Sequence, residues 1–291
     1  MAGFAGLAER GSDVGGGDAG SEAAAGAVVE RLRAAGCVFA EDEARLLVDG
    51  AASPEELEAA VARRVAGEPL EYILGWAEFC GLRILVTQGV FVPRRRTEVL
   101  VREALSLLDR VARDGAVVVD LCCGSGAVAA AIARARPSAL IHAVDIDPDA
   151  VACARRNLAG GAATVALGDL FAPLPEDLRG RVDVVVANAP YVPTGAIGLM
   201  PPEARDHEHR VALDGGADGT DLHRRIAAGA RAWLAPGGSL LIEAGREQAL
   251  TTARHLSDAG LAASVVEDDE YDATVVVGTL AIDAAATGEA P

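Results

Sequence analysis

Short apolar runs alternate with stretches of helical periodicity from residue 117 to the end of the chain. Such runs, rich in valine and leucine, predict strands that are buried on both faces. The predicted strands are residues 117–120, 140–145, 165–169, 182–187, 239–243, 264–267 and 274–279. Helices are predicted over residues 127–135, 149–158 and 220–234 and after the fifth strand, and a long loop over 192–218. The alternation predicts an α/β fold with a doubly wound, mostly parallel, seven-stranded sheet, whose last two strands form an antiparallel edge hairpin.

The first part of the chain has a different pattern. Ser53-Pro54-Glu55-Glu56 predicts the start of a helix, with serine as the N-cap, proline in the first position and Glu56 as the third residue of a capping box. Residues 76–79 and 82–86 predict the two arms of a β-hairpin. The expected organisation is a disordered extension at 1–20, a helical domain at 21–75, a hairpin linker at 76–92, the α/β domain at 93–282 and a tail at 283–291.

The composition limits the class of partner and the compartment. The chain carries 26 basic and 43 acidic residues, a net charge of −17. This balance argues against broad binding to a nucleic-acid backbone, which requires a basic surface. The five cysteines include no C-x-x-C pair, which predicts reduced thiols in a cytoplasmic protein. No charge-free apolar stretch reaches about 18 residues, and the N-terminus lacks the pattern of a secretory signal, so neither a membrane span nor export is expected.

Polar residues follow the predicted strands where a ligand site is expected. Residues 120–126 read D-x-x-x-G-x-G, and the next strand ends in Asp145. Glycine lets the backbone approach a ligand closely, and an acid at the next strand end can accept hydrogen bonds from ribose hydroxyls. A nicotinamide cofactor would require a third glycine where Ala129 stands. An adenosyl ligand without a pyrophosphate, such as S-adenosylmethionine, fits better, and Asp169 at the third strand end is placed to meet its adenine amino group.

The fourth predicted strand ends in Asn188-Ala189-Pro190-Tyr191. A polar and aromatic corner at the carboxyl end of a buried parallel strand is where α/β proteins place their chemistry. Asn and Pro are also ordinary residues of a strand-ending turn. The glycine loop and the acid that precede this corner favour the functional interpretation, in which Asn188 lies beside the methyl group of the cofactor.

Two charged segments have both a functional and a structural interpretation. The three arginines at residues 94–96 form either a solvated helix entry or an anchor for an anionic group. His207 and His209, with acids at 206 and 208, suggest either metal ligands or a solvated charged loop. We expect the loop and no metal site, because no third ligand is suitably spaced.

Several motifs occur together and in order. They are Gly67-x-Pro69-x-x-Tyr72-Ile73-x-Gly75, Phe91-Val92-Pro93-Arg94-x-x-Thr97-Glu98, the loop at Asp120, Asp145, Gly168-Asp169 with Phe171, and Asn188 to Tyr191. Over residues 64–280 the chain resembles the HemK/PrmC-type protein-(glutamine-N5) methyltransferases, and is most similar to an actinobacterial side branch of unassigned substrate. The resemblance implies a class I fold dependent on S-adenosylmethionine, with a small helical N-terminal domain and a β-hairpin linker. It also implies methylation of a glutamine side-chain amide, in the Gly-Gly-Gln tip of a peptide-chain release factor or in a ribosomal protein.

The resemblance assigns residues to two sites. The implied cofactor-binding residues are Asp120, Cys122, Cys123, Gly124, Ser125, Gly126, Asp145, Asp169, Leu170 and Asn188. The implied catalytic and substrate-binding residues are Asn188, Ala189, Pro190 and Tyr191, with Arg94 and Thr97 as further substrate-binding residues. In this assignment the Asn188 side-chain oxygen and the Ala189 backbone carbonyl accept the two N–H groups of the substrate amide. The expected partner is a protein that presents a glutamine, with no membrane or direct nucleic-acid binding, and the chain is expected to be a monomer.

Three positions depart from the family pattern. Ala189 replaces the first proline of Asn-Pro-Pro-Tyr, which keeps the carbonyl acceptor but removes the lock on the backbone. Cys122 replaces the first glycine of the cofactor loop, where a side chain would crowd the ligand or require a negative φ. Arg95 and Arg96 replace Pro-Glu. The resemblance therefore predicts the reaction of this chain more firmly than it predicts the substrate.

Three alternatives to protein methylation stay open. A similar corner serves methyltransferases that act on the amino group of adenine, where Tyr191 would stack on a flipped base, but the acidic charge opposes this. A small-molecule methyltransferase would leave the N-terminal helical domain without a role. A non-catalytic cofactor-binding scaffold is compatible with the changes at Cys122 and Ala189, since fold alone does not settle function.

Overall fold

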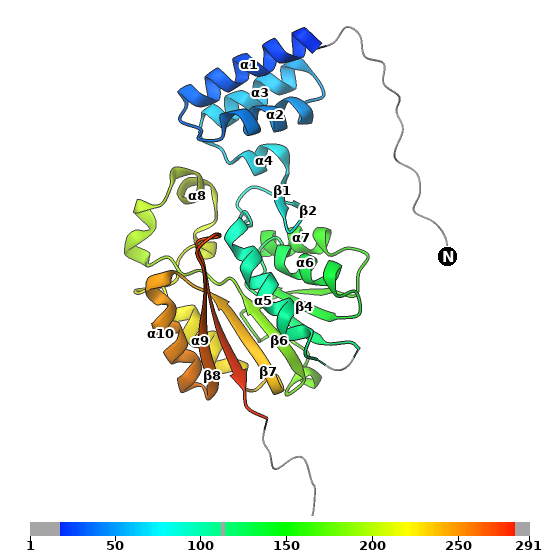
Figure 1. Ribbon diagram of the computed structural model, residues 1–291, viewed down its shortest axis with the longest axis vertical. Coiled ribbons are helices and arrows are strands. Elements are labelled where there is room, and N and C mark those ends of the chain that lie inside the picture. Colours follow the sequence, from blue (N-terminus) through cyan, green and yellow to red (C-terminus); the bar gives the residue numbers. More distant parts are fainter. Residues whose placement is uncertain (1–17, 112–113, 283–291) are drawn as a thin grey trace, which may run out of the picture. The chain divides into compact units, whose positions relative to one another are not determined.

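The computed structural model describes residues 18–111 and 114–282 (Figure 1). Contacts between Cα atoms divide the chain into two compact units, Met1–Ile73 and Leu74–Pro291. Most of the extension expected at 1–20 and all of the tail expected at 283–291 lie outside the described residues. Helix α1 (Asp18–Ala34) begins before residue 21, where the sequence predicts the start of the helical domain.

The first unit is helical, as predicted. After α1 it contains α2 (Ala40–Gly50) and α3 (Pro54–Val65), and the short α4 (Leu70–Leu74) crosses the division between the units. Leu32, Leu47 and Val61, one from each of the first three helices, are fully buried. Burial of these side chains supplies the apolar core that a bundle of short helices requires.

The predicted cap of α3 forms. The Ser53 hydroxyl accepts a hydrogen bond from the Glu56 N–H at 3.2 Å. The Glu56 carboxylate accepts from the Ala52 N–H at 2.9 Å, one residue before the N–H that a standard capping box uses. An N-cap of this kind stabilises a helix by about 1 kcal/mol.

The second unit is built on a seven-stranded sheet. Its strands are β3 (Val117–Leu121), β4 (Leu140–Asp145), β5 (Thr164–Leu167), β6 (Val182–Ala187), β7 (Leu234–Glu243), β8 (Leu261–Asp268) and β9 (Ala273–Leu280). Their order in the sheet is β5-β4-β3-β6-β7-β9-β8. The first five are parallel, whereas β9 is antiparallel to both β7 and β8. The predicted doubly wound, mostly parallel sheet with an antiparallel edge hairpin is therefore confirmed.

Helices cover both faces of this sheet (Figure 1). On one face lie α5 (Glu98–Leu108), α6 (Ala127–Ala135) and α7 (Pro148–Asn157), and on the other lie α9 (Asp221–Ala230) and α10 (Ala249–Asp258). Val118 of β3 packs into the first layer, while its neighbours Val117 and Val119 pack into the second. Successive side chains of a strand point to opposite faces, so a continuous valine run serves both cores.

The predicted hairpin is present as β1 (Trp76–Phe79) and β2 (Leu82–Leu85). Phe79 and Ile84 are buried in the core beside α5 and α6. The Leu85 N–H donates to the Asn157 side-chain oxygen at 2.8 Å, and the Asn157 amide donates back to the Leu85 carbonyl at 2.9 Å. The hairpin is thus fixed to the end of α7 as part of the second unit.

Among the boundaries that differ from the prediction, those between residues 192 and 234 change the most. The expected loop at 192–218 contains α8 (Pro202–His207), because Pro202 occupies the first helical position that proline favours. Short 3₁₀ segments lie on either side of it, at Thr194–Leu199 and Arg210–Ala212. Helix α9 ends at Ala230 instead of at 234, because Leu234 already pairs with Val182 in the sheet.

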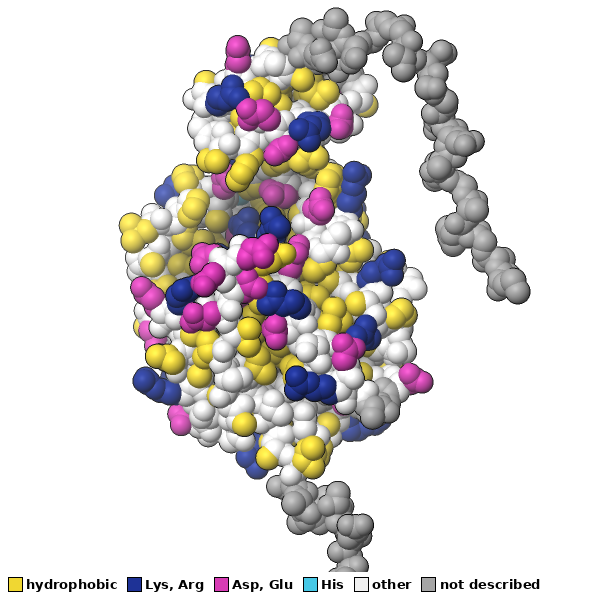
Figure 2. Space-filling model, in the orientation of Figure 1, with side chains coloured by type: hydrophobic (Ala, Val, Ile, Leu, Met, Phe, Trp, Pro, Cys, Tyr) yellow, Lys and Arg dark blue, Asp and Glu magenta, His cyan; other side chains and the backbone are white. Residues whose placement is uncertain are grey.

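The surface drawn in Figure 2 mixes basic and acidic side chains, without a broad basic area on that face. All five cysteines have free thiols. None of the helices in the described ranges combines the length and apolar composition needed to cross a bilayer.

Candidate active site

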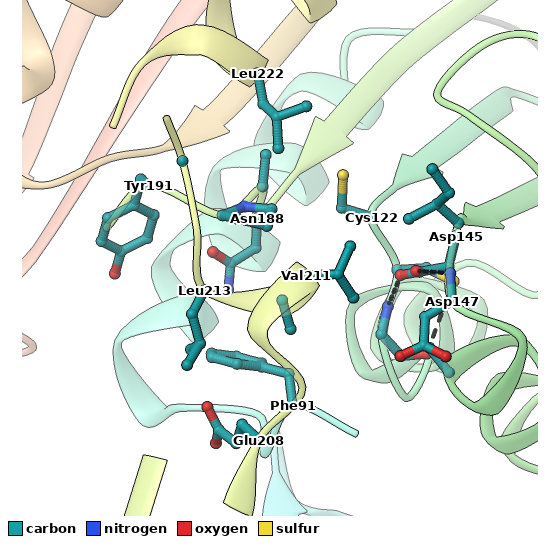
Figure 3. A pocket seen from close by; sticks show the side chains of 18 of the residues that line it. Phe91, Cys122, Asp145, Asp147, Asn188, Tyr191, Glu208, Val211, Leu213 and Leu222 are labelled. Atoms are coloured by element: carbon teal, nitrogen blue, oxygen red, sulfur yellow. Dashed lines mark hydrogen bonds between the residues drawn. The ribbon is translucent and has the colours of Figure 1, made fainter. Parts of the chain in front are cut away.

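A cavity of about 790 Å³ opens at the carboxyl ends of β3, β4 and β6 (Figure 3). Strand β3 lies between β4 and β6, so the order of the sheet reverses at this point. Open α/β sheets bind ligands at such a switch point. Leu121 pairs with Val144 on one side and with Ala187 on the other, so the three strands end level with one another. Every site residue that the sequence predicts lines this cavity except Gly126.

The loop after β3 adopts left-handed backbone angles. Cys122 has φ +56°, Gly124 has +54° and Gly126 has +77°. The expectation that Cys122 would need a negative φ is therefore wrong. A left-handed conformation costs a residue with a side chain about 1–2 kcal/mol, and Cys122 carries this strain where glycine would avoid it. Burial, together with the nearby Asp145 and Asp120, raises the pKa of the Cys122 thiol, so the thiol is neutral.

The two glycines of this loop have different physical roles. A Cβ atom on Gly126 would lie 3.0 Å from the Ala154 Cβ, so its absence lets α6 pack closely on α7. A Cβ atom on Gly124 would have only the Phe91 Cβ nearby, at 4.0 Å, and Gly124 lines the cavity. Gly126 therefore serves packing, and Gly124 leaves room for a ligand.

Two carboxylates, of Asp120 and Asp145, belong to the cavity lining. Asp145 accepts hydrogen bonds from the Gly124 N–H at 2.8 Å and the Asp147 N–H at 2.9 Å, which ties the glycine loop to β4. Asp120 is buried and accepts from the Ala129 N–H at 3.0 Å. Burial raises the pKa of Asp120 to about 7 and also raises the pKa of Asp145. A cation in the cavity would lower both pKa values again, because a nearby positive charge favours the ionised carboxylate.

Asp169 lies at the cavity wall in an ion pair with Arg225 of α9, at 2.6 Å. Both side chains are about half exposed. The next residue, Leu170, has φ +49° and also lines the cavity. Arg225 thus binds one oxygen of the Asp169 carboxylate. The other oxygen is left for the adenine contact that the sequence predicts.

The corner after β6 is held by its backbone. The Val192 N–H donates to the Leu213 carbonyl at 3.1 Å, and the Gly215 N–H donates to the Val192 carbonyl at 2.9 Å. The Gln248 side-chain amide donates to the Tyr191 carbonyl at 2.8 Å. Gly215 approaches so closely that a Cβ atom there would lie 2.7 Å from the Pro190 carbonyl oxygen. Ala189 is fully buried. Neighbouring segments therefore pack closely around this corner.

The three arginines at 94–96 have partners within the chain. Arg94 forms an ion pair with Glu208, and Arg96 lies 3.3 Å from Glu243. Arg95 stacks over the ring of Tyr271, at 5.2 Å from its centroid. These side chains therefore contact internal groups, while Arg94 and Arg96 also line the cavity. The interpretation as an anchor for an external anion stays a prediction.

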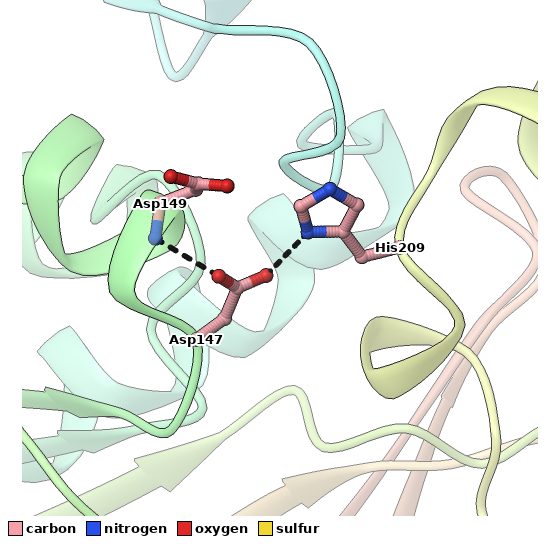
Figure 4. A group of neighbouring side chains, drawn as sticks. All are labelled: Asp147, Asp149 and His209. Atoms are coloured by element: carbon pink, nitrogen blue, oxygen red, sulfur yellow. Dashed lines mark hydrogen bonds and ion pairs between the residues drawn. The ribbon is translucent and has the colours of Figure 1, made fainter.

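The segment at 206–209 is only partly the solvated loop that the sequence predicts, because Asp206 is exposed whereas Glu208 is buried. Glu208 is 6% exposed and also accepts from the Val92 N–H at 3.4 Å, which joins this segment to the one before α5. His209 Nδ1 lies 2.6 Å from an oxygen of Asp147, whose other oxygen caps α7 through the Asp149 N–H (Figure 4). Ligand atoms of Asp147, Asp149 and His209 lie within 4.8 Å of one another. Each Asp147 oxygen thus binds a group within the chain. The expectation that no third ligand lies near His209 is wrong, because Asp147 and Asp149 come close to it only in the folded chain.

Sequence reasoning missed two buried carboxylates near the cavity, Glu208 and Glu243. Glu208 was considered only as an acid of the charged segment, and its burial gave no signal, because the packing there depends on residues more than a hundred positions away. Glu243 did give one, since it ends a buried strand in the same way as Asp145. An acid at the end of a buried strand, the pattern that identified Asp145, could therefore also have identified Glu243.

The geometry of this site defines a class of protein. The sheet order, the cavity at the switch point and the acids at the ends of β3 and β4 are those of a class I methyltransferase. The methyl donor of this class is S-adenosylmethionine. The cavity fits it, because Gly124 leaves room for the ligand and two carboxylates among the lining residues favour a cationic ligand.

Comparison with known proteins defines the family. Residues 82–199 match the methyltransferase small domain. A release factor glutamine methyltransferase of Geobacter sulfurreducens is 44% identical over 231 residues, which cover 78% of this chain and 79% of that protein. A 4-amino-L-phenylalanine/4-methylamino-L-phenylalanine methyltransferase of Streptomyces pristinaespiralis is 40% identical over 191 residues, 65% of each chain. The crystal structure of a protein-(glutamine-N5) methyltransferase from Alicyclobacillus acidocaldarius aligns with a TM-score of 0.42 at 29% identity, over 65% of this chain and 94% of that one. The chain belongs to the family of release factor glutamine methyltransferases.

Proposed function

We propose that this enzyme transfers a methyl group from S-adenosylmethionine to the side-chain amide nitrogen of a glutamine in a protein, with a peptide-chain release factor as the substrate. The observation that carries this proposal is the carboxamide of Asn188 at the cavity wall. In the view of Figure 3 it lies between the Tyr191 ring and Cys122. Its amide nitrogen donates to the Thr97 hydroxyl at 3.2 Å, which leaves its oxygen available as an acceptor.

The proposed chemistry follows from the nucleophile. An amide nitrogen is a weak nucleophile because its lone pair is delocalised into the carbonyl group. The Asn188 side-chain oxygen and the Ala189 carbonyl would accept its two N–H groups and direct the lone pair toward the methyl group. The bound cofactor supplies an electrophilic methyl group on a sulfonium. Holding the reacting atoms in line is worth on the order of 7 kcal/mol or more, and the proton can leave to water after transfer.

The charge distribution supports a protein substrate over a nucleic acid. The net charge is −17, and the face drawn in Figure 2 has no broad basic area. Phosphate-backbone binding draws most of its affinity from lysine and arginine contacts. A release-factor substrate would place the enzyme in the cytoplasm, and we expect it to act as a monomer.

The division of the chain at Ile73 and Leu74 supports two separate parts in the proposed enzyme. We assign methyl transfer to the part built on the seven-stranded sheet, because the whole cavity lies within it. The helical domain proposed at 21–75 is then available to bind a macromolecular substrate.

A second candidate substrate is the amino group of a small aromatic molecule. The relative from Streptomyces pristinaespiralis that bears the name of such an activity is 40% identical. Phe91 and Tyr191 both line the cavity and offer aromatic faces to such a ligand. The helical domain would have no evident role in that reaction, so protein methylation is the better supported function.

Mass spectrometry of cellular proteins tests the proposal. Cells with and without the enzyme would be compared for methylation at glutamine. Loss of methylated glutamine from a release factor in cells without the enzyme is the expected result. An unchanged proteome, with methylation lost from a small aromatic amine, would favour the second candidate. Loss of methyl groups from nucleic acid would contradict both.

A further inference from the structure

A guanidinium group lies at the cavity wall beside the corner at Asn188. Arg96 directly precedes Thr97, whose hydroxyl accepts a hydrogen bond from the Asn188 side chain at 3.2 Å. The Arg96 side chain lines the cavity and is 42% exposed, and its guanidinium carbon lies 5.8 Å from the centroid of the Tyr191 ring. In the view of Figure 3, Tyr191 lies on the side of Asn188 away from Asp145. Arg96 is therefore placed beside the substrate amide and not beside the acid expected to bind the cofactor ribose.

A buried carboxylate holds this guanidinium by one edge. Arg96 Nε donates to Glu243 Oε1 at 3.3 Å, and the Glu243 side chain is only 2% exposed. Within residues 18–111 and 114–282, this is the only hydrogen bond that the Arg96 side chain makes. A guanidinium carries five N–H donors in a fixed plane. The donors on its two terminal nitrogens are thus left for a ligand in the cavity.

Arg94 has the same arrangement two residues earlier. It forms an ion pair with the buried Glu208, and its own side chain is partly exposed and lines the cavity. Its guanidinium carbon lies 5.2 Å from the centroid of the Phe91 ring. Burial raises the pKa of the Tyr191 hydroxyl to about 12, and the positive charges of both arginines oppose this rise. Both guanidinium groups therefore lie near the transfer corner, each between a buried acid and the cavity.

The two ion pairs decide which kind of group these donors fit. Each arginine is matched by one buried carboxylate, so the donors are presented without net positive charge. A phosphate or carboxylate of a ligand would be repelled by Glu208 and Glu243 behind the arginines. A neutral carbonyl oxygen accepts the same hydrogen bonds without that repulsion, and every residue of a protein substrate carries one on its main chain. The arrangement therefore fits a peptide carbonyl better than an anion.

We propose that Arg96 is a substrate-binding residue, whose terminal N–H groups donate to a main-chain carbonyl oxygen next to the methylated glutamine. This inference rests on the proposed function and deepens it, because it states how the enzyme recognises the peptide around the reacting side chain. Arg96 stands where the family pattern has glutamate, so the contact is a feature of this chain. Asn188 and Ala189 hold the side-chain amide, and Arg96 holds the backbone that carries it.

Weakening one substrate carbonyl at a time tests the contact directly. A release factor is prepared by ligation with an ester in place of the peptide bond on one or the other side of the glutamine, because an ester carbonyl is a weaker acceptor than an amide carbonyl. One of the two esters should raise KM about fivefold for wild type. The same ester should raise KM by less than about twofold for Arg96→Gln, because the contact is already absent.

Variants of the arginine test the same contact from the enzyme side. Arg96→Gln should raise KM for the release factor about tenfold and change kcat by less than about threefold, the pattern of a lost binding contact. Arg96→Lys keeps the charge but loses the planar fork, so its KM should lie between those of wild type and Arg96→Gln. The dissociation constant for S-adenosylmethionine should stay within about twofold in each variant.

Arg95→Gln is the matched control. Arg95 stacks over the Tyr271 ring and does not belong to the cavity lining, so its removal should change KM by less than about twofold. Arg96→Gln leaves a buried carboxylate without its charge partner, which can prevent folding. In that case the double variant Arg96→Gln, Glu243→Gln removes both charges and carries the test.

Sodium sulfate tests the preference for a neutral group without any reaction. Glu243→Gln removes the acid behind Arg96 and leaves its charge unmatched. Titrated by calorimetry at constant ionic strength, sulfate should bind to this variant at least about tenfold more tightly than to wild type. Equally tight binding to wild type, lost in Arg96→Gln, would show an anion site and overturn the inference.

The other outcomes separate the inference from the function on which it rests. Equal effects of both esters on wild type and Arg96→Gln would overturn the inference, and so would an unchanged KM in Arg96→Gln. A joint loss of kcat and cofactor affinity would overturn it too, because that pattern indicates collapse of the site. If wild type methylates no glutamine, the proposed function is wrong. Calorimetric binding of the release factor and its two esters then still decides whether Arg96 contacts a carbonyl.

Discussion

Replacing the two loop glycines by alanine should have different main effects, Gly126→Ala on stability and Gly124→Ala on cofactor binding. Gly126 and Gly124 are two residues apart, and both have left-handed backbone angles. A methyl group on Gly126 meets α7, whereas a methyl group on Gly124 points into open space beside Phe91. The pair therefore separates the packing role of the loop from its ligand-binding role.

The magnitudes follow from these contacts. Alanine at φ +77° or +54° costs about 1–2 kcal/mol in either position. Gly126→Ala adds a Cβ at 3.0 Å from the Ala154 Cβ and 3.2 Å from its Cα, and overpacking of this kind costs about 1–3 kcal/mol more. We expect a loss of about 2–5 kcal/mol of unfolding free energy for Gly126→Ala and about 1–2 kcal/mol for Gly124→Ala.

Urea unfolding and calorimetry with S-adenosylmethionine measure both effects. Gly124→Ala should weaken cofactor binding about tenfold or more, because its methyl group occupies the cavity lining. Gly126→Ala should bind within about threefold of wild type at a temperature where it is folded. The reasoning is refuted if Gly124→Ala is the less stable variant, or if Gly126→Ala is the one that loses affinity.

Three further predictions address the reaction, the cofactor site and the core. Asn188→Ala should lower kcat by about 100-fold or more with little change in cofactor affinity; activity near wild type would refute its role. The pKa of Asp120 is about 7 because of burial, and a bound cation favours its ionised form. Cofactor affinity measured by calorimetry should therefore weaken as pH falls below about 7, by at most about tenfold per pH unit, and Asp120→Asn should flatten this dependence. Burial lowers the pKa of His223 to about 4. The folding stability that its buried, neutral ring provides is therefore complete above about pH 6.5, and about 3 kcal/mol of it is lost as the pH falls toward 4. The stability difference between wild type and His223→Gln in urea should shrink over that range, and a constant difference would contradict the assignment.

The sheet could be predicted from the sequence because its strands carry strong local signals. Mostly apolar runs that end in Asp120, Asp145 and Asn188 identify both the strands and the edge at which they end. The carboxyl ends of parallel strands meet at one edge, so most of the cavity wall followed as well. The cap at Ser53 could be predicted for the same reason, since its geometry depends on neighbouring residues alone.

The rest depends on contacts between distant segments. The loop after residue 191 has weak periodicity, and the burial of Glu208 depends on its contacts with Arg94 and the Val92 N–H. The strand end at Glu243 was visible in the sequence, but its contacts with Arg96 and Tyr191 join residues that are far apart in the chain. Side-chain orientation of this kind is a tertiary property, and no spacing rule predicts it.

The central claim is that the corner at Asn188 directs methyl transfer to a glutamine side chain. The most direct test incubates the purified enzyme with S-adenosylmethionine that carries a deuterated methyl group and with a purified release factor, followed by tandem mass spectrometry. We predict one labelled methyl group on the side-chain nitrogen of the glutamine in the Gly-Gly-Gln tip, and none with Asn188→Ala. Label at another residue, or equal labelling by Asn188→Ala, would contradict the account.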